Sequence, residues 1–595
     1  METSTPVGTW YLVAQGERLE LTIHPVASGF TGSIRPEGGA PEPVDAIQWD
    51  AGGCWLEFRR TGPAFVQWFR ACVTEGVMAG RFSYATTSAR PALTDFTEHV
   101  TGWSPEGLDT DIVPRTWNVT IEGTVQAVLR IDRDARGAVV GRLKVFADTS
   151  KPTPLCEELE EDLASIAWDG THLAFTRANQ TFRGTCHGRF IRGSFTTEEG
   201  ASKPWSGARA QVLGFGLGSR LAQRDAWQQA TRARIVNLTE GMRLAGASQP
   251  AVGVVDEGAV EPFRGGYPPE RDDAPNLWPP RYALRKLQFS VSPGSRFDPD
   301  SPPLPRVFSG LLATPTGPVP LGGFRAVVVV NGHGGSAQQV MTSSDPRYWY
   351  GDSAARRDLV VLAIDIGHRP RWDTPPIVHR AIVDHGYADS NWEEDGERAF
   401  SVRCAIDWLL SQPNVRKDRL FMMGHALGGE VTAIVSGLDP RVQMAVVAGF
   451  SSDLHVMDLK GNHPCYRWDH ADIHEYLDVS DWQALIAPRL LVVETGIADG
   501  TCSARQPPFS ADKQVTRRAR EAYGPSAENV IHYLHSGASQ FRVGGSNPSE
   551  PRRPEGVLAA NVIAPRAPGD QSWQTDRSTS LRSPSVFHLL NQFFI

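Results

Sequence analysis

From Tyr282 to the C-terminus, short apolar runs alternate with segments of helical periodicity, and this alternation limits the fold more than any other feature of the chain. Strands separated by helices form a mainly parallel sheet with helices on both faces. We expect strands at 283–291, 307–313, 326–331, 359–364, 420–423, 442–448, 490–494 and 530–534, and helices at 395–411, 428–437, 512–523 and 585–594. The pattern therefore predicts a doubly wound α/β domain built on eight strands.

The first third of the chain contains two copies of one β unit, at residues 7–86 and 115–197. The matching segments are Thr9-Trp10 with Thr116-Trp117, Ile47-Gln48-Trp49-Asp50 with Ile166-Ala167-Trp168-Asp169, and Gln67 to Gly80 with Gln180 to Gly193. Apolar and polar residues alternate in both copies, which indicates half-buried antiparallel strands. We expect two duplicated small antiparallel β units, packed as two barrels or as halves of one sandwich.

Between the β units and the α/β region, residues 225–244 have the apolar spacing of an amphipathic helix. Residues 250–280 are rich in Pro and Gly and are interpreted as an extended connector on the surface. The predicted division of the chain is a first β repeat at 1–100, a second at 101–210, the helix and connector at 211–281, and the α/β domain at 282–595.

Composition excludes several classes of function. The net charge is −8 and no run of Lys or Arg occurs, so nucleic acid is not an expected partner. No stretch approaches the ~18 apolar residues of a membrane span, and residues 1–13 lack the features of a signal peptide. The seven cysteines are scattered without a Cys-x-x-Cys pair, which argues against a disulfide framework and a zinc site. We expect a cytoplasmic protein without a cofactor that binds a small molecule; its oligomeric state stays open.

The segment Gly424-His425-Ala426-Leu427-Gly428-Gly429 lies between a predicted strand and a predicted helix. This is the context of the Gly-x-Ser-x-Gly nucleophile elbow, whose glycines leave room for a strained turn. Ala426 occupies the serine's position, and a methyl group cannot attack a carbonyl. The sequence thus predicts an elbow without a nucleophile.

Together with the elbow, other segments of this region resemble the α/β-hydrolases of the dienelactone-hydrolase and acetyl-xylan-esterase type. They are Asn331-Gly332-His333-Gly334-Gly335, Arg403 to Leu409, Leu438 to Val442, and Leu485 to Leu491. The resemblance implies that the loop 331–335 and the residue after the elbow, Leu427, help to form an oxyanion hole. It also implies that Asp499 is the triad acid and that the triad histidine belongs at position 539.

The chain departs from that pattern a second time, because position 539 holds Ser539 rather than histidine. His535 lies four residues upstream and is the alternative base. His333 and His425 flank the expected pocket, as wall residues or as proton carriers. His463, His470 and His474 lie near two aspartates, but their spacing matches no zinc pattern, so no metal is expected.

Three functional hypotheses follow from a carboxylic-ester hydrolase lineage that is inactive as written. The first is a pseudoenzyme or repurposed scaffold with a degenerate catalytic triad, which binds an ester- or carbonyl-containing small molecule. The second is a serine esterase or deacylase captured as an inactive serine-to-alanine variant at position 426. The third is a proton-transfer, cyclase or lyase activity in the same pocket, which uses His333, His425 or Asp499.

Overall fold

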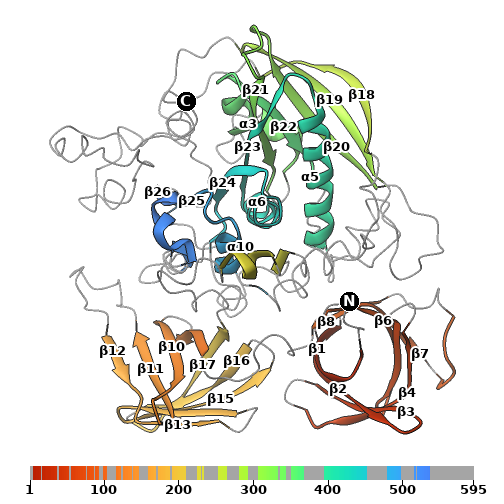
Figure 1. The fold of residues 1–595 in the computed structure, drawn as a ribbon, viewed down its shortest axis with the longest axis vertical. Helices are drawn as coiled ribbons and strands as arrows, with labels where there is room; N and C mark the ends of the chain where they lie inside the picture. The colour runs from red at the N-terminus through yellow and green to blue at the C-terminus, as the bar shows by residue number, and fades with distance from the viewer. Residues whose placement is uncertain are drawn as a thin grey trace.

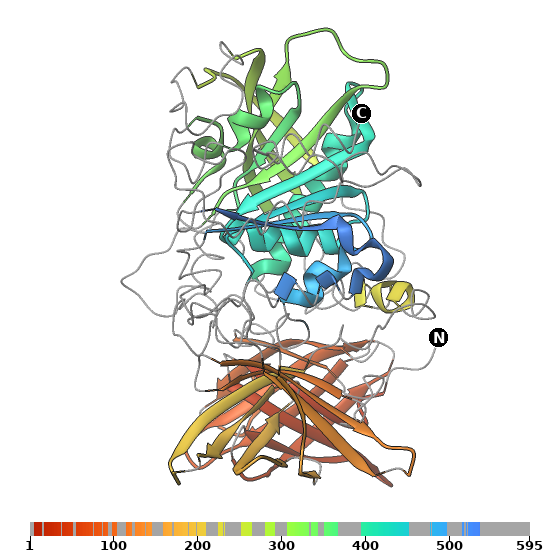
Figure 2. The ribbon, with the colours of Figure 1, turned by 90° about the vertical axis from the view of Figure 1, so that its left-hand side faces the viewer.

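A computed structural model describes most of the chain (Figures 1 and 2). The described ranges are 5–103, 115–145, 159–209, 224–232, 252–263, 280–291, 306–342, 350–366, 394–451, 477–496 and 515–535, with short gaps inside several of them that include 333–334. Over these ranges the protein has a β-rich N-terminal part and an α/β part. Within these ranges, no helix is long and apolar enough to cross a membrane.

The first β unit is a closed eight-stranded barrel, seen at the lower right of Figure 1. Its strands are β1 (Gly8–Ala14), β2 (Glu17–Val26), β3 (Gly29–Pro36), β4 (Glu42–Asp50), β5 (Trp55–Thr61), β6 (Val66–Thr74), β7 (Val77–Ala85) and β8 (Glu98–Trp103). Consecutive strands pair antiparallel, and β8 returns to pair with β1. The barrel thus contains one strand more than the repeat recognised in the sequence.

The second β unit repeats this strand order as a separate sheet. Its strands are β9 (Arg115–Ile121), β10 (Val125–Arg133), β11 (Val139–Val145), β12 (Leu159–Asp162), β13 (Ser165–Trp168), β14 (His172–Arg177), β15 (Gln180–His187), β16 (Phe190–Thr196) and β17 (Ser202–Arg209). β17 pairs with β9 as β8 pairs with β1. The sheet has β12 at one edge and β13 at the other. These two short strands together correspond to β4 of the first unit. The two units therefore form separate sheets: the first is a closed barrel, and the second is a nine-stranded sheet that does not close among the described residues.

The same aromatic positions fill both β units. Phe58, Phe69 and Phe82 are fully buried and stacked, with ring centroids 4.7 and 5.2 Å apart. Phe175, Phe182 and Phe195 form the equivalent stack, with centroids 4.7 and 4.8 Å apart. These side chains come from inward positions of adjacent strands, where alternation places every second residue in the core. The interiors around these stacks are therefore packed with side chains.

The α/β part is built on one nine-stranded sheet with the order β18-β19-β20-β22-β21-β23-β24-β25-β26. Its strands are β18 (Gly253–Val260), β19 (Tyr282–Val291), β20 (Arg306–Pro315), β21 (Phe324–Val330), β22 (Val360–Ile364), β23 (Val415–His425), β24 (Val442–Ala448), β25 (Leu490–Gly496) and β26 (Val530–His535). The strands from β22 to β26 are parallel, whereas β18, β19 and β20 pair antiparallel. All eight strands expected from the sequence are present.

The ninth strand corrects the sequence interpretation of residues 250–280. That stretch is not only a surface connector, because β18 lies within it and pairs with β19 along the edge of the sheet. Its side chains are mostly exposed and the pairing is interrupted by an irregularity between Asp256 and Gly258. An exposed edge strand has no apolar stripe, so hydrophobic patterning did not reveal it.

Helices cover both faces of the sheet. α2 (Ala337–Thr342) and α3 (Tyr350–Ala355) pack on one face. α5 (Glu394–Ser411), α6 (Leu427–Leu438) and α10 (Val479–Leu485) pack on the other. The chain adds β22 on one side of β21 and then crosses to add β23 on the other side. This reversal is the topological switch point, where open α/β sheets place their ligand sites.

A buried polar cluster ties β19 to α3. The Tyr282 hydroxyl donates to the Asp352 carboxylate, and Arg356 Nε donates to the same carboxylate at 2.7 Å. Arg356 also donates to the carbonyl of Phe263 at 2.8 Å. This bond ties the end of residues 252–263 to α3. Burial raises the pKa of Asp352 to about 7 and that of Tyr282 to about 12, although Arg356 opposes both shifts.

The separate ladders of the two β units predict separate effects of core truncation. Phe69→Ala and Phe182→Ala should each destabilise their own unit by about 3–5 kcal/mol, because each removes a buried ring from a stack. Hydrogen exchange followed by mass spectrometry should show faster exchange in the mutated unit alone. The exposed controls Val26→Ala and Val140→Ala should change little. Equal acceleration in both units by either ring truncation would contradict this independence.

The raised pKa of Asp352 predicts that stability falls as pH rises. In the unfolded chain Asp352 ionises near its ordinary pKa of 3.8, but in the folded protein it ionises only near 7. Unfolding between these pH values releases a proton, so stability should fall by at most ~1.4 kcal/mol per pH unit between about pH 4 and 7. Urea unfolding of wild type and Asp352→Asn over that range should show the decline flattened in the variant. The exposed Asp418→Asn control should retain it, and an unchanged slope in Asp352→Asn would refute the assignment.

Candidate functional site

The candidate site lies at the switch point, where β23 ends and α6 begins. Ala426 joins them with φ 53° and ψ −117°, a conformation rare for residues other than glycine. Its N–H donates to the carbonyl of Ala448 on β24 at 2.9 Å, and its own carbonyl accepts from Glu430 N at 3.0 Å. The turn therefore has the sharp geometry that the sequence predicted for an elbow.

Close backbone contacts enforce this turn. A Cβ on Gly424 would stand 2.2 Å from the carbonyl oxygen of Gly428, and a Cβ on Gly428 would stand 2.3 Å from that of Val330. Both distances are far inside van der Waals contact, so a side chain at either position would push the helix away from the sheet. Glycine at these two positions is thus a steric requirement of the strand-turn-helix unit.

The loop after β21 lies against the elbow. A Cβ on Gly332 would stand 3.5 Å from the Cβ of Ala426. The Gly332 carbonyl accepts from Gly335 N at 3.0 Å and from Asn331 Nδ2 at 3.1 Å. Asn331 is fully buried, and its Oδ1 accepts from Ile366 N at 3.4 Å. The Asn331 amide therefore links this loop to the end of β22.

The N-terminal end of α6 supplies the electrostatics of the site. Leu427 is the first residue of this twelve-residue helix, and all of its residues are buried. The first N–H groups of a helix have no acceptor within the helix and carry partial positive charge. They therefore favour binding of a carbonyl or anionic oxygen at the N-terminal end. The arrangement can thus polarise a carbonyl beside Ala426, but the Ala426 methyl supplies no nucleophile.

Two further titratable groups lie at the level of the elbow. His425 on β23 is in register with Ala448 on β24, and Ala448 is in register with Glu494 on β25. His425 and Glu494 are both buried. Strand alternation places both side chains on the face covered by α2 and α3, two strand spacings or about 10 Å apart. The His425 Nδ1 lies 3.5 Å from the point where a Cβ on Gly332 would stand.

The structure brings together some of the site residues predicted from the sequence. Ala426, His425, Leu427 and the ends of the loop, Gly332 and Gly335, meet at the switch point. His333, Gly334, Asp499, Ser539, His463, His470 and His474 lie outside the described residues. In the part of the chain that is described, no group of three or more His, Cys, Asp or Glu side chains could hold a metal ion.

His535, the alternative base, is the last residue of β26 and pairs with Gly496 on β25. β26 is separated from the elbow strand β23 by β24 and β25. Three strand spacings amount to about 14 Å, which exceeds the reach of a histidine side chain. The position of its backbone thus disfavours direct contact between His535 and residue 426.

Sequence reasoning missed Asn331 and Glu494 as residues of this site. Asn331 was interpreted only as part of a Gly-rich loop, and Glu494 only as the end of a strand. A signal was present for Glu494, because a carboxylate ends the apolar run Leu490-Leu491-Val492-Val493. A buried polar residue in such a run requires a partner or a function.

No protein-family profile matches the sequence, and no curated protein does. Solved structures match it at low identity. A glucuronoyl esterase from Solibacter usitatus matches over 58% of this chain and 92% of its own, at 11% identity and a TM-score of 0.38. Acetyl xylan esterase 1 from Thermoanaerobacterium sp. matches over 56% of this chain and 91% of its own, at 15% identity and a TM-score of 0.32. The fold of this chain therefore rests on its own strand order and turn geometry.

The strained turn makes a prediction for position 426. Ala426→Gly should leave the free energy of unfolding unchanged or raise it by ~1 kcal/mol, because glycine relieves a strain of about 1–3 kcal/mol and costs about 0.4–1 through the unfolded chain. Ala433→Gly, in the middle of the same helix, should lower it by ~1 kcal/mol or more. Urea unfolding of both variants compares them directly. Equal destabilisation by the two changes would show that Ala426 is unstrained.

Proposed function

We propose that this chain is an α/β-hydrolase-fold protein that binds an ester- or carbonyl-containing small molecule and does not hydrolyse it through a serine. One observation carries the proposal: Ala426 has the backbone conformation of an elbow residue, at the switch point of a doubly wound sheet, with a methyl side chain. The scaffold that presents a nucleophile is thus retained, and the nucleophile is absent.

Ligand binding is supported by groups that do not depend on the side chain at position 426. The N-terminal end of α6 lies at the site. Gly332 lies beside Ala426, and Asn331 ties the loop that contains Gly332 to Ile366. Backbone N–H groups arranged in this way stabilise a carbonyl oxygen whether or not a hydroxyl attacks the carbon. Affinity for a carbonyl group and absence of turnover are therefore compatible in one site.

The position of His535 supports loss of the general base as well. A base must lie within ~2.6–3.2 Å of the hydroxyl that it deprotonates. His535 is three strands from β23, and the position expected for the triad histidine holds Ser539. An inactive variant of an esterase would differ at one catalytic position, whereas two positions depart here. This favours the repurposed scaffold over the substituted esterase.

A proton-transfer activity is the second candidate function, and one observation favours it. His425 and Glu494 are buried on one face of the sheet at the level of the elbow, on strands separated only by β24. An imidazole and a carboxylate beside a bound ligand can accept and donate a proton. Isomerisation of a carbonyl compound with loss of a deuterium label would identify this activity.

Restoration of the missing groups tests the proposed function. Wild type should hydrolyse p-nitrophenyl acetate no faster than a surface variant, since residual catalysis without a triad is ~10³–10⁴-fold over water at best. Ala426→Ser alone should remain inactive. The double variant Ala426→Ser with Ser539→His should recover measurable turnover, and a further Asp499→Asn change should remove it.

The control is Ala426→Ser with His535→Ala. Activity of Ala426→Ser alone that is lost with His535→Ala would mean that His535 is the base and that the chain is a disabled esterase. Sustained turnover by wild type would overturn the proposal outright. Ligand-observed NMR with p-nitrophenyl acetate should also show binding to wild type without release of p-nitrophenol.

A further inference from the structure

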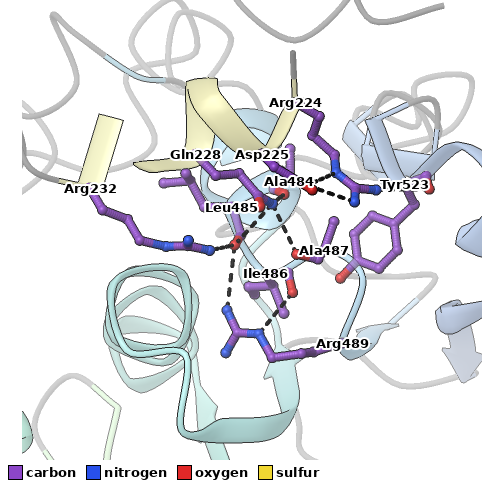
Figure 3. Close-up of polar contacts among 10 residues, drawn as sticks. All are labelled: Arg224, Asp225, Gln228, Arg232, Ala484, Leu485, Ile486, Ala487, Arg489 and Tyr523. Atoms are coloured by element: carbon purple, nitrogen blue, oxygen red, sulfur yellow. Dashed lines mark hydrogen bonds and ion pairs between the residues drawn. The ribbon is translucent and has the colours of Figure 1, made fainter. Parts of the chain in front are cut away.

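The elbow helix α6 and the helix α10 end beside each other, inside the protein. Figure 3 shows the carbonyls at the end of α10 contacted by the side chains of Gln228, Arg232 and Arg489. Helix ends leave their last four carbonyls without partners in the helix, and buried carbonyls must find other donors. The donors found here come from outside both helices.

Two arginines satisfy the end of α6. Arg489, the residue before β25, donates from Nη2 to the carbonyl of Ser436 at 2.7 Å and from Nη1 to that of Asp439 at 2.9 Å. Arg232 donates from Nε to the carbonyl of Gly437 at 2.7 Å. Arg232 belongs to residues 224–232, which precede the α/β sheet in the chain.

Residues 224–232 also satisfy the end of α10. Gln228 Nε2 donates to the carbonyls of Ala484 and Ala487 at 3.0 and 2.9 Å, and Gln228 is buried. Arg232 Nη2 donates to the carbonyl of Leu485 at 2.6 Å. One guanidinium thus connects the last turns of two helices from a third segment of chain. Figure 3 shows its bond to Leu485.

This contact places two buried, positively charged guanidiniums against the carbonyl ends of helices. Burial lowers the pKa of the Arg232 guanidinium and lowers that of Arg489 to about 10. Both guanidiniums face the negative ends of helix dipoles, which stabilise cations there. Removal of Arg232 would take its short hydrogen bond from the Gly437 carbonyl of α6. It would leave the Leu485 carbonyl of α10 with only the longer bonds from Gln228 and Arg489, both at 3.4 Å.

We propose that Arg232 is a positioning residue for the elbow, which acts through α6. Ala426 precedes the first residue of this helix, and Gly437, which Arg232 holds, is next to its last. A buried helix moves as a unit, so release of its far end lets the helix shift and relaxes the turn at Ala426. Through Arg232 the segment between the β units and the α/β sheet sets the geometry of the candidate site. This role of Arg232 rests on the proposed function only in assuming that the elbow is a ligand-binding site.

The test is hydrogen exchange of the full-length protein under native conditions, which needs no ligand. Arg232→Met should accelerate exchange of the Ala426 and Glu430 amides at least tenfold, because both are hydrogen-bonded at the start of α6. Arg520→Met is the matched control, since Arg520 is also a partly buried arginine that donates to a carbonyl, that of Val530. It should leave the elbow amides unchanged.

Two results would overturn the inference. One is unchanged exchange at Ala426 and Glu430 in Arg232→Met. The other is equal acceleration over the whole α/β sheet, which indicates a loss of stability without a local role. If Arg232→Met does not fold, Arg232→Lys gives the same comparison, because lysine keeps the charge but does not span the carbonyls of Gly437 and Leu485 with one planar group. Failure of the proposed function would appear separately, as ester hydrolysis by wild type.

Discussion

The contact between the backbone of α6 and the backbone of β21 determines the rest of the α/β part. Gly428 lies so close to the Val330 carbonyl that no side chain fits between them. This contact fixes where α6 begins, and the helix is buried along its whole length. Its last carbonyls consequently end inside the protein, where Arg232 and Arg489 satisfy them. The candidate site and the arginines Arg232 and Arg489 thus lie at opposite ends of the same buried helix.

Much of the α/β fold could be predicted because its central strands are apolar on both faces. The strand 442–448 has the predicted bounds, and α5 and α6 differ from prediction by one residue at each end or less. α2, α3 and α10 were missed, since each is seven residues or shorter and too short for a clear helical period. β18 was missed for the opposite reason, because it is too exposed to carry an apolar pattern.

The candidate site was predictable where it depends on local backbone rules and not where it depends on contacts between distant segments. The glycines around Ala426 predict the elbow from the sequence, because the turn itself requires them. The roles of Asn331 and Arg232 depend on partners at Ile366 and Leu485, which no local pattern reveals. The duplication shows the same division, because the stacked Phe positions repeat in the sequence whereas the break between β12 and β13 does not.

The elbow conformation at position 426 survives without a hydroxyl because none of the bonds that hold it involves the side chain. The N–H of Ala426 is held by Ala448, and its carbonyl is held by Glu430, both through backbone bonds. The close packing of Gly424 and Gly428 fixes the turn, and the positive φ at position 426 disfavours β-branched residues but requires no hydroxyl. The fold therefore constrains the backbone conformation at position 426 more than the chemistry of its side chain. The backbone geometry of the turn and the N–H groups at the start of α6 are therefore independent of the side chain at position 426.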